Sequence, residues 1–195
     1  MPFDLDFEPI DFPVVHKTLG PQLALLRVAL LDDIITWQET WQPLLQEKGQ
    51  YDGEWPWKEH IEHALHHKDA LCLAVVRGEE LDALASFRIE RGTSRLVPGK
   101  DLIYIEYVGT APWNQASPVG DLQIRGLGKA LLRIAVGLSK ELGLEGRVGL
   151  HSKKEVEGFY RRIGMREVKP EDTGDGIWLY FETGPAEAET LLEGV

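Results

Sequence analysis

Two glycines mark the point where an extended stretch of the chain gives way to an amphipathic helix. Gly126 and Gly128 lie in the segment QIRGLGKALL, residues 123–132. Because glycine has no side chain, backbone N–H groups there can approach a bound group closely. The first turn of a helix also carries unpaired N–H donors and the positive end of the helix dipole. This spacing predicts an anion site that suits a phosphate, whereas an isolated G-x-G more often forms only a tight turn.

Neither of two common phosphate-binding motifs is present in this segment. A dinucleotide fingerprint would need a third glycine where Leu131 stands, and a P-loop would need a lysine followed by serine or threonine. The segment therefore predicts a phosphate site of another kind.

The apolar periodicity predicts the elements that must position this loop. Spacings of three and four residues indicate helices, and alternation or short apolar runs bounded by turn residues indicate strands. We expect helices at 21–47 (kinked or divided at Pro43), 57–67, 126–142 and 154–163, and strands at 70–77, 82–90, 101–110, 146–152, 164–169 and 176–182. Gly143 is expected to end the third helix. This order describes an α/β protein of the α+β kind, with a mixed sheet covered by helices.

Length and composition limit the number of domains and the classes of function that the chain can have. With 195 residues, 43% of them hydrophobic, the chain is expected to form a single domain with a core at 14–182 and an acidic tail at 183–195. A formal net charge of −11, without a basic patch, argues against nucleic-acid binding. No run approaches the ~18 apolar residues of a membrane span. The single Cys72 and an acidic start without a leader pattern lead us to expect a cytoplasmic protein.

At the glycine loop the chain resembles the GNAT superfamily of acyl-CoA-dependent N-acyltransferases. Gln123, Gly126 and Gly128 match that family's Q/R-x-x-G-x-G/A loop, and FYRRIGM (residues 159–165) looks like its FYxxxGF segment. The similarity extends over residues 70–182, in the family's order of elements. It implies a central, mostly antiparallel, twisted sheet flanked by helices, with two strands splayed around a pantetheine site.

The resemblance also implies a cofactor and its contacts. In the family, main-chain amides of the loop hold the pyrophosphate of CoA, and a strand end takes the pantetheine as a pseudo-strand. Acetyl-CoA is the expected co-substrate because the family mostly uses it, and no metal ion is expected. Carried over, the pyrophosphate contacts are Ile124, Arg125, Gly126, Leu127, Gly128 and Lys129, and the pantetheine contacts are Val108, Gly109 and Thr110.

One departure from the family pattern is a longer loop after the pantetheine strand. Pro112 and Gln123 are eleven positions apart, which is more than is usual in the family. Trp113 and Asn114 in the added stretch either contact the substrate or only cover the site.

Acyl transfer to an amine needs a base more than an acid. An alkyl ammonium with a pKa near 10.4 costs about 4–5 kcal/mol to deprotonate at pH 7, whereas a thiol leaving group needs about 2 kcal/mol of help. Tyr160 matches the family's tyrosine and is the candidate acid, with helix-to-sheet packing as the alternative. Glu106 is the candidate base, with a salt bridge as the alternative, and His151 is the fallback base. Val148 and Lys153 stand where members of the family have a glutamate or an asparagine.

A run of histidines is the remaining candidate for chemistry. The sequence EHIEHALHH puts His60, His63 and His67 on one face of a helix. The H-E-x-x-H order is absent and no remote ligand is evident. We therefore interpret this face as solvated or acid-sensing rather than as a metal site.

Together these features predict an N-acetyltransferase that transfers the acetyl group directly to a primary amine of a small molecule or peptide. The acidic balance favours a cationic acceptor. The alternative is a non-catalytic acyl-CoA-binding or interaction module of the same fold. The expected state is a monomer or a homodimer, with neither nucleic acid nor a membrane as partner.

Overall fold

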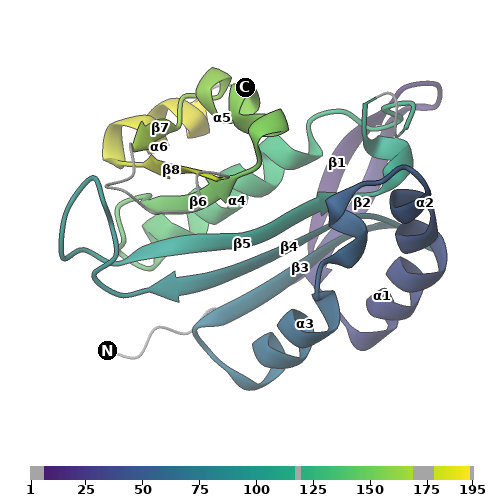
Figure 1. Cartoon of the computed structure of the whole chain (residues 1–195), viewed down its shortest axis with the longest axis horizontal. Coiled ribbons are helices and arrows are strands. Elements are labelled where there is room, and N and C mark those ends of the chain that lie inside the picture. Colours follow the sequence, from purple (N-terminus) through teal and green to yellow (C-terminus); the bar gives the residue numbers. More distant parts are fainter. Residues whose placement is uncertain (1–6, 117–119, 169–177, 194–195) are drawn as a thin grey trace. The chain divides into compact units, whose positions relative to one another are not determined.

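The computed structural model describes residues 7–116, 120–168 and 178–193. Its eight strands pair in the order β1-β2-β3-β4-β5-β6-β8-β7 (Figure 1). β5 and β6 are parallel, whereas the pairs β1/β2, β2/β3, β6/β8 and β7/β8 are antiparallel, which confirms the mixed, mostly antiparallel sheet. The strands are β1 (Ile10–His16), β2 (Gly20–Val28), β3 (Ala70–Arg77), β4 (Glu80–Glu90), β5 (Leu102–Thr110), β6 (Val148–Ser152), β7 (Arg166–Val168) and β8 (Leu179–Thr183).

Six α-helices accompany these strands within the same described ranges. They are α1 (Leu31–Thr36), α2 (Gln42–Glu47), α3 (Trp57–His66), α4 (Leu127–Glu141), α5 (Glu157–Arg162) and α6 (Pro185–Glu193). None of the helices that the structure describes is long and apolar enough to cross a membrane. Residues 169, 176 and 177, which the sequence assigns to the last two strands, lie outside the described residues.

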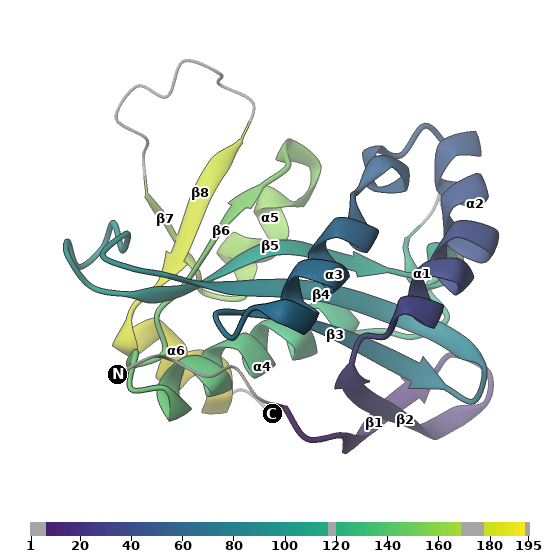
Figure 2. The ribbon, with the colours of Figure 1, turned by 90° about the horizontal axis from the view of Figure 1, so that it is seen from below.

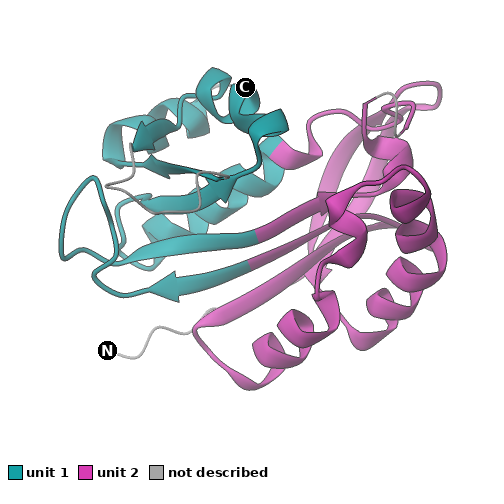
Figure 3. Cartoon of the chain, viewed as in Figure 1, with its two compact units in different colours: residues 1–3, 87–106, 129–195 teal, residues 4–86, 107–128 magenta. Residues whose placement is uncertain are grey.

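The chain divides into two compact units by its internal contacts (Figure 3). The first unit comprises residues 1–3, 87–106 and 129–195, and the second comprises residues 4–86 and 107–128. The strands β4 and β5 and the helix α4 contribute residues to both units. That the chain forms a single domain stays a prediction.

The predicted helix at 21–47 is wrong in its first third. That part is β2, which pairs with β1 on one side and with β3 on the other. Ala24 and Leu26 are buried on one face of β2, whereas Leu23 and Leu25 on the opposite face are exposed. Because apolar side chains occupy both faces, the run imitates helical spacing. The sequence predicts no strand at β1, which completes this hairpin.

The rest of that region is helical and is divided near Pro43, as expected. α1 ends at Thr36, and a wide π turn spans Trp37–Trp41 before α2 begins. Pro43 has no N–H to donate to the carbonyl four residues earlier. The amide of Gln42 instead donates to the carbonyl of Trp37, five residues back. Both tryptophans that flank the turn are buried.

The second unit has a core rich in tryptophan. α1, α2 and α3 pack against β3 and β4 (Figure 2). Trp41 donates from its Nε1 to the carbonyl of Leu81, 3.1 Å away, so the polar atom of this buried ring is satisfied. Gly109 of β5 lies against this core, since a Cβ there would be 3.3 Å from an atom of Trp57 and 3.4 Å from an atom of Trp55.

The first unit is built around most of α4 and the strands β6 to β8. Leu131, Leu132, Ala135 and Val136 make one buried stripe on α4, and Gly143 follows the helix at a φ of +74°. The acidic tail is a docked helix, α6, because Arg133 donates to the carbonyl of Leu192 and Lys140 pairs with Glu189. The helix predicted at 126–142 and its end at Gly143 are therefore confirmed.

Gly109→Ala tests the packing of β5 against the tryptophans. We expect the free energy of unfolding to fall by about 1–3 kcal/mol, because the added methyl group would lie 3.3 Å from Trp57 and 3.4 Å from Trp55 and these rings would have to shift. Gly137→Ala, inside α4, is the matched control, since nothing lies within 4 Å of its Cβ position. The control should stabilise by roughly 0.5–1 kcal/mol. Urea unfolding of both variants measures this, and a Gly109→Ala protein as stable as the wild type would contradict the packing.

Candidate functional site

The glycine loop opens α4 as the sequence predicts. Gly126 has a φ of +85°, a backbone conformation that favours glycine, and no atom lies within 4 Å of its Cβ position. Arg125 and Gly126 are exposed, and Gly128 and Lys129 are half-buried. α4 is 15 residues long, and the N–H groups of its first turn have no carbonyl four residues earlier within the helix. This end of α4 therefore has the geometry of an anion site.

A chain of buried polar groups holds the residue before this loop. The amide of Ile124 donates to Asn114 Oδ1 at 3.1 Å, and Asn114 Nδ2 donates to Asp82 Oδ1 at 2.9 Å. Arg77 completes the chain by donating from Nε to Asp82 Oδ2 at 2.9 Å. The side chain of Asp82 is 0% exposed, so its charge depends on these partners. The Arg77–Asp82–Asn114–Ile124 chain thus fixes where the glycine loop begins.

This chain changes the expected roles of two residues. The amide of Ile124 is already used inside the protein, so Ile124 is an anchor, and the candidate anion contacts narrow to Arg125–Lys129. Asn114 is buried and bonded to Asp82, so it supports the loop and does not face a substrate. Trp113 packs edge-on against Trp41, with ring centroids 6.5 Å apart. Residues 117–119 of the added loop lie outside the described residues.

The expected pantetheine strand is the end of β5. Its ladder with β6 spans Ile103–Ile105, whereas β5 itself continues to Thr110. The carbonyl of Thr110 accepts a hydrogen bond from Gln115 Nε2 at 3.0 Å, and Gly109 is buried against tryptophans. Val108 is half-buried.

Glu106 is held in an ion pair. Its Oε1 lies 3.3 Å from Arg88 Nη1, and its side chain is 14% exposed. Arg88 also pairs with Glu90 and lies over the ring of Tyr104. The salt bridge that the sequence left open as the alternative is therefore present, and the role of Glu106 as the base stays a prediction.

Tyr104 and His151 form a hydrogen-bonded pair across β5 and β6. Tyr104 Oη lies 2.7 Å from His151 Nδ1. Burial raises the pKa of Tyr104 to about 12, and burial together with the charge of Arg95 lowers the pKa of His151 below its usual value. The imidazole is therefore neutral at neutral pH. In the tautomer whose Nδ1–H donates to Tyr104, Nε2 is left as a proton acceptor, and in that form His151 can serve as a base.

A second buried carboxylate supports this pair. Glu182 is 0% exposed and accepts hydrogen bonds from Ser94 Oγ at 2.5 Å, the amide of Arg95 at 2.8 Å and Tyr180 Oη at 3.0 Å. The ring of Tyr180 packs edge-on against His151, with centroids 5.0 Å apart. Gly149 makes room for it, because a Cβ there would lie 2.2 Å from Tyr180 Oη. Sequence analysis missed this network; the alternation that puts Gly149 and His151 on one face of β6 was the available signal.

Tyr160 lies on the other face of the sheet within the first unit. Its ring packs on Phe181, with centroids 5.6 Å apart, and burial raises its pKa to about 12. Phe181 and Tyr180 are neighbours on β8, so their side chains point to opposite faces. Tyr160 is therefore separated from the His151 face. A phenol of this pKa donates a hydrogen bond readily, but full transfer of its proton to a thiolate of ordinary pKa near 8.5 is uphill by about 5 kcal/mol.

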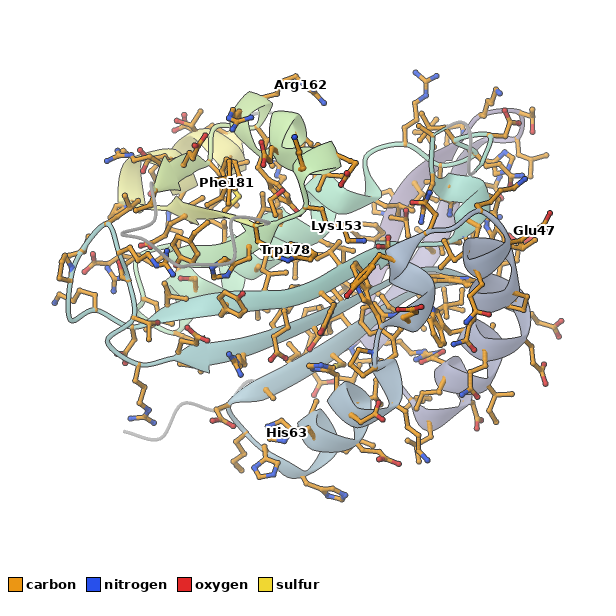
Figure 4. The ribbon with its side chains drawn as sticks, viewed as in Figure 1. Glu47, His63, Lys153, Arg162, Trp178 and Phe181 are labelled. Atoms are coloured by element: carbon orange, nitrogen blue, oxygen red, sulfur yellow. The ribbon has the colours of Figure 1, made fainter. Side chains whose placement is uncertain are left out.

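Lys153 follows the end of β6, where the family often has asparagine. Its side chain is half-buried, and burial lowers its pKa to about 8. Part of this amine is therefore neutral at slightly alkaline pH. Figure 4 shows Lys153 among the side chains of the first unit.

No protein-family model and no curated protein matches the sequence. Solved structures do match. The GNAT domain of PAT from S. lividans is 17% identical over 89% of this chain and 96% of its own, with a TM-score of 0.58. The N-acetyltransferase YlbP from Bacillus subtilis, solved with coenzyme A, is 14% identical over 84% and 97%, with a TM-score of 0.55. The fold is that of the GNAT acetyltransferases.

A third GNAT-fold structure is similar over most of its length. The PaiA N-acetyltransferase from Thermoplasma acidophilum, solved with coenzyme A, is 14% identical over 82% of this chain and 97% of its own, with a TM-score of 0.50. These structures thus confirm the fold that the resemblance implied.

The buried hydrogen-bonded chain can be tested by exchanging the Asp side chain at position 82 and the Asn side chain at position 114. Asn114→Asp places two carboxylates face to face, and Asp82→Asn removes the charge that Arg77 pairs with. We expect each single variant to lose about 2–4 kcal/mol of unfolding free energy in urea. The double variant restores one donor, one acceptor and one negative charge, so it should recover most of the loss. Losses that simply add in the double variant would contradict the chain.

Proposed function

We propose that this protein is an acyl-CoA-dependent N-acyltransferase that transfers an acetyl group from acetyl-CoA to a primary amine of a small molecule or peptide. One observation carries the proposal. The exposed glycine loop opens a long helix in a GNAT fold, and Gly126 has a backbone conformation that favours glycine, so this position carries no side chain. This is the end of the helix that the family uses to hold a pyrophosphate.

The cofactor contacts divide between the two elements already described. The amides of Arg125–Lys129 take the pyrophosphate, and the side chains of Arg125 and Lys129 add positive charge beside it. The main chain of Val108–Thr110 takes the pantetheine, with Gly109 held in place by the tryptophan core. The reaction requires no metal ion.

The chemistry is a direct transfer within a ternary complex. His151 Nε2 accepts a proton from the ammonium form of the acceptor, and Tyr104 holds the opposite nitrogen of the ring. The neutral amine attacks the thioester carbonyl and a C–N bond forms. The attached nitrogen then gives up a second proton as the C–S bond breaks, and this proton is available to the departing sulfur. Tyr160 donates a hydrogen bond to the departing sulfur, which leaves as the thiol of CoA once it takes up a proton.

The net negative charge of the chain indicates which class of acceptor it binds. The chain has 32 Asp and Glu against 21 Lys and Arg, which favours a cationic amine and disfavours nucleic acid. A cytoplasmic location and a monomer or homodimer complete the proposal.

A non-catalytic acyl-CoA-binding module is the second candidate, because two observations favour it. Glu106 is paired with Arg88, and Lys153 replaces the family's asparagine. In that case CoA binds but no amine is acetylated.

Binding and turnover separate these two candidates. We expect calorimetry to detect CoA binding by the wild type and at least tenfold weaker binding by Gly126→Val, since a β-branched residue is strained at this φ.

Release of thiol from acetyl-CoA over a panel of primary amines measures turnover. His151→Asn should lower kcat/KM by about 100-fold or more, and Tyr160→Phe by less, with CoA affinity unchanged in both. CoA binding without turnover selects the module, and absence of binding rejects the proposal.

The pH profile tests His151 as the base. Its pKa lies below the ordinary value of 6.5, so protonation removes the base only at lower pH. We expect kcat/KM at pH 6.5 to remain above half of its maximum. The acid limb should disappear in His151→Asn. A midpoint at or above pH 6.5 would contradict this assignment, and a limb lost only in Glu106→Gln would make Glu106 the base.

A further inference from the structure

Three metal-ligating side chains meet where α3 ends and β3 begins. The rings of His63 and His67 are stacked, with centroids 4.0 Å apart and an angle of 15° between their planes. Asp69 joins them, and one ligand atom from each residue lies within 4.8 Å of the other two. All three side chains are exposed, and Figure 4 shows His63 beside α3.

The path of the chain supplies the ligand that helical spacing alone does not. α3 ends at His66, and His67 is extended, with a φ of −130° and a ψ of 123°. The chain then turns through Lys68 and enters β3 at Ala70, whose amide donates to the carbonyl of His67 at 3.3 Å. Asp69 is therefore brought back to the histidines by the start of a buried strand.

His60, the third histidine on the expected helical face, has a different environment. Its ring packs edge-on against Tyr107, with centroids 4.8 Å apart, and its Nδ1 lies 3.3 Å from Ser86 Oγ. The histidine run thus divides into a packed member, His60, and the exposed pair His63 and His67.

We propose that His63, His67 and Asp69 form a surface site for a divalent transition-metal ion of the kind that imidazole binds, such as Zn²⁺, Ni²⁺ or Cu²⁺. Metal–nitrogen bonds of about 2.0–2.1 Å place tetrahedral ligands roughly 3.3 Å apart, so rotation of exposed side chains closes the site. The negative end of the α3 dipole and the carboxylate of Asp69 both stabilise a cation there. Three protein ligands leave a position for water.

The chemistry of the donors decides which ions bind. Two imidazoles and one carboxylate favour first-row transition metals, whereas Mg²⁺ and Ca²⁺ need oxygen ligands. Because the ligands are exposed, we expect weaker binding than at a buried structural site.

Titration of the full chain, freed of any affinity tag, with ZnCl2 and NiCl2 tests the site. Isothermal calorimetry should give one ion per chain. We expect His63→Asn, His67→Asn and Asp69→Asn each to weaken binding at least tenfold. His66→Asn is the matched control, because His66 is exposed in the same helix but is not one of the three ligands. MgCl2 should give no binding.

The outcomes are decisive in both directions. Absence of saturable binding up to millimolar Zn²⁺, or equal weakening by His66→Asn, overturns the proposal. Circular dichroism of each variant shows that the fold is retained. A rise in melting temperature with Zn²⁺ in the wild type, absent in His63→Asn, provides a second readout. The test does not involve CoA, so it stands apart from the proposed acyl transfer.

Discussion

A buried carboxylate is the interaction on which the loops of the second unit depend. The side chain of Asp82 has no exposed surface, and a charge in that position is costly unless it is paired and hydrogen-bonded. Arg77 supplies the charge, Asn114 donates a hydrogen bond to the same carboxylate, and the carbonyl of Asp82 accepts the amide of Ala111 at 2.9 Å. One residue of β4 therefore holds the end of β5 and the start of the added loop, and through Asn114 it holds Ile124. The glycine loop can remain open because the residue before it is fixed in this way.

The first unit also contains a buried carboxylate that connects loops to the sheet, Glu182. This carboxylate is also fully buried, and its partners come from a distant loop, through Ser94 and Arg95, and from its own strand, through Tyr180. Tyr180 in turn packs against His151, so the second carboxylate positions the candidate base as the first positions the anion loop. In both units a buried acidic residue inside a strand ties loops to the sheet.

Short sequence patterns predicted the elements whose structure depends on their own residues. They failed where contacts with residues far away in the sequence decide the structure. α4 was predictable because its apolar stripe repeats at helical spacing and a glycine ends it. β2 was not, because its two faces are both apolar for different reasons: Leu26 faces the core and Leu23 lies on the exposed side of a hairpin. The site shows the same division. The glycine loop and Tyr160 follow from short motifs, but the bond from Asn114 to Asp82 joins residues 32 positions apart and has no local signature.

The two faces of the sheet in the first unit constrain how the proposed reaction proceeds. His151 lies with Tyr104 and Tyr180 on one face, whereas Tyr160 packs on Phe181 on the other. In the proposed reaction the base and the sulfur partner therefore belong to opposite faces of this sheet, and each acts on a different atom, His151 on the amine and Tyr160 on the sulfur. A covalent acyl-enzyme would need a nucleophile at the carbonyl, and the lone thiol, Cys72, is buried in the core of the second unit. Direct transfer with both substrates bound is accordingly the route that we propose, because it needs no acylated side chain.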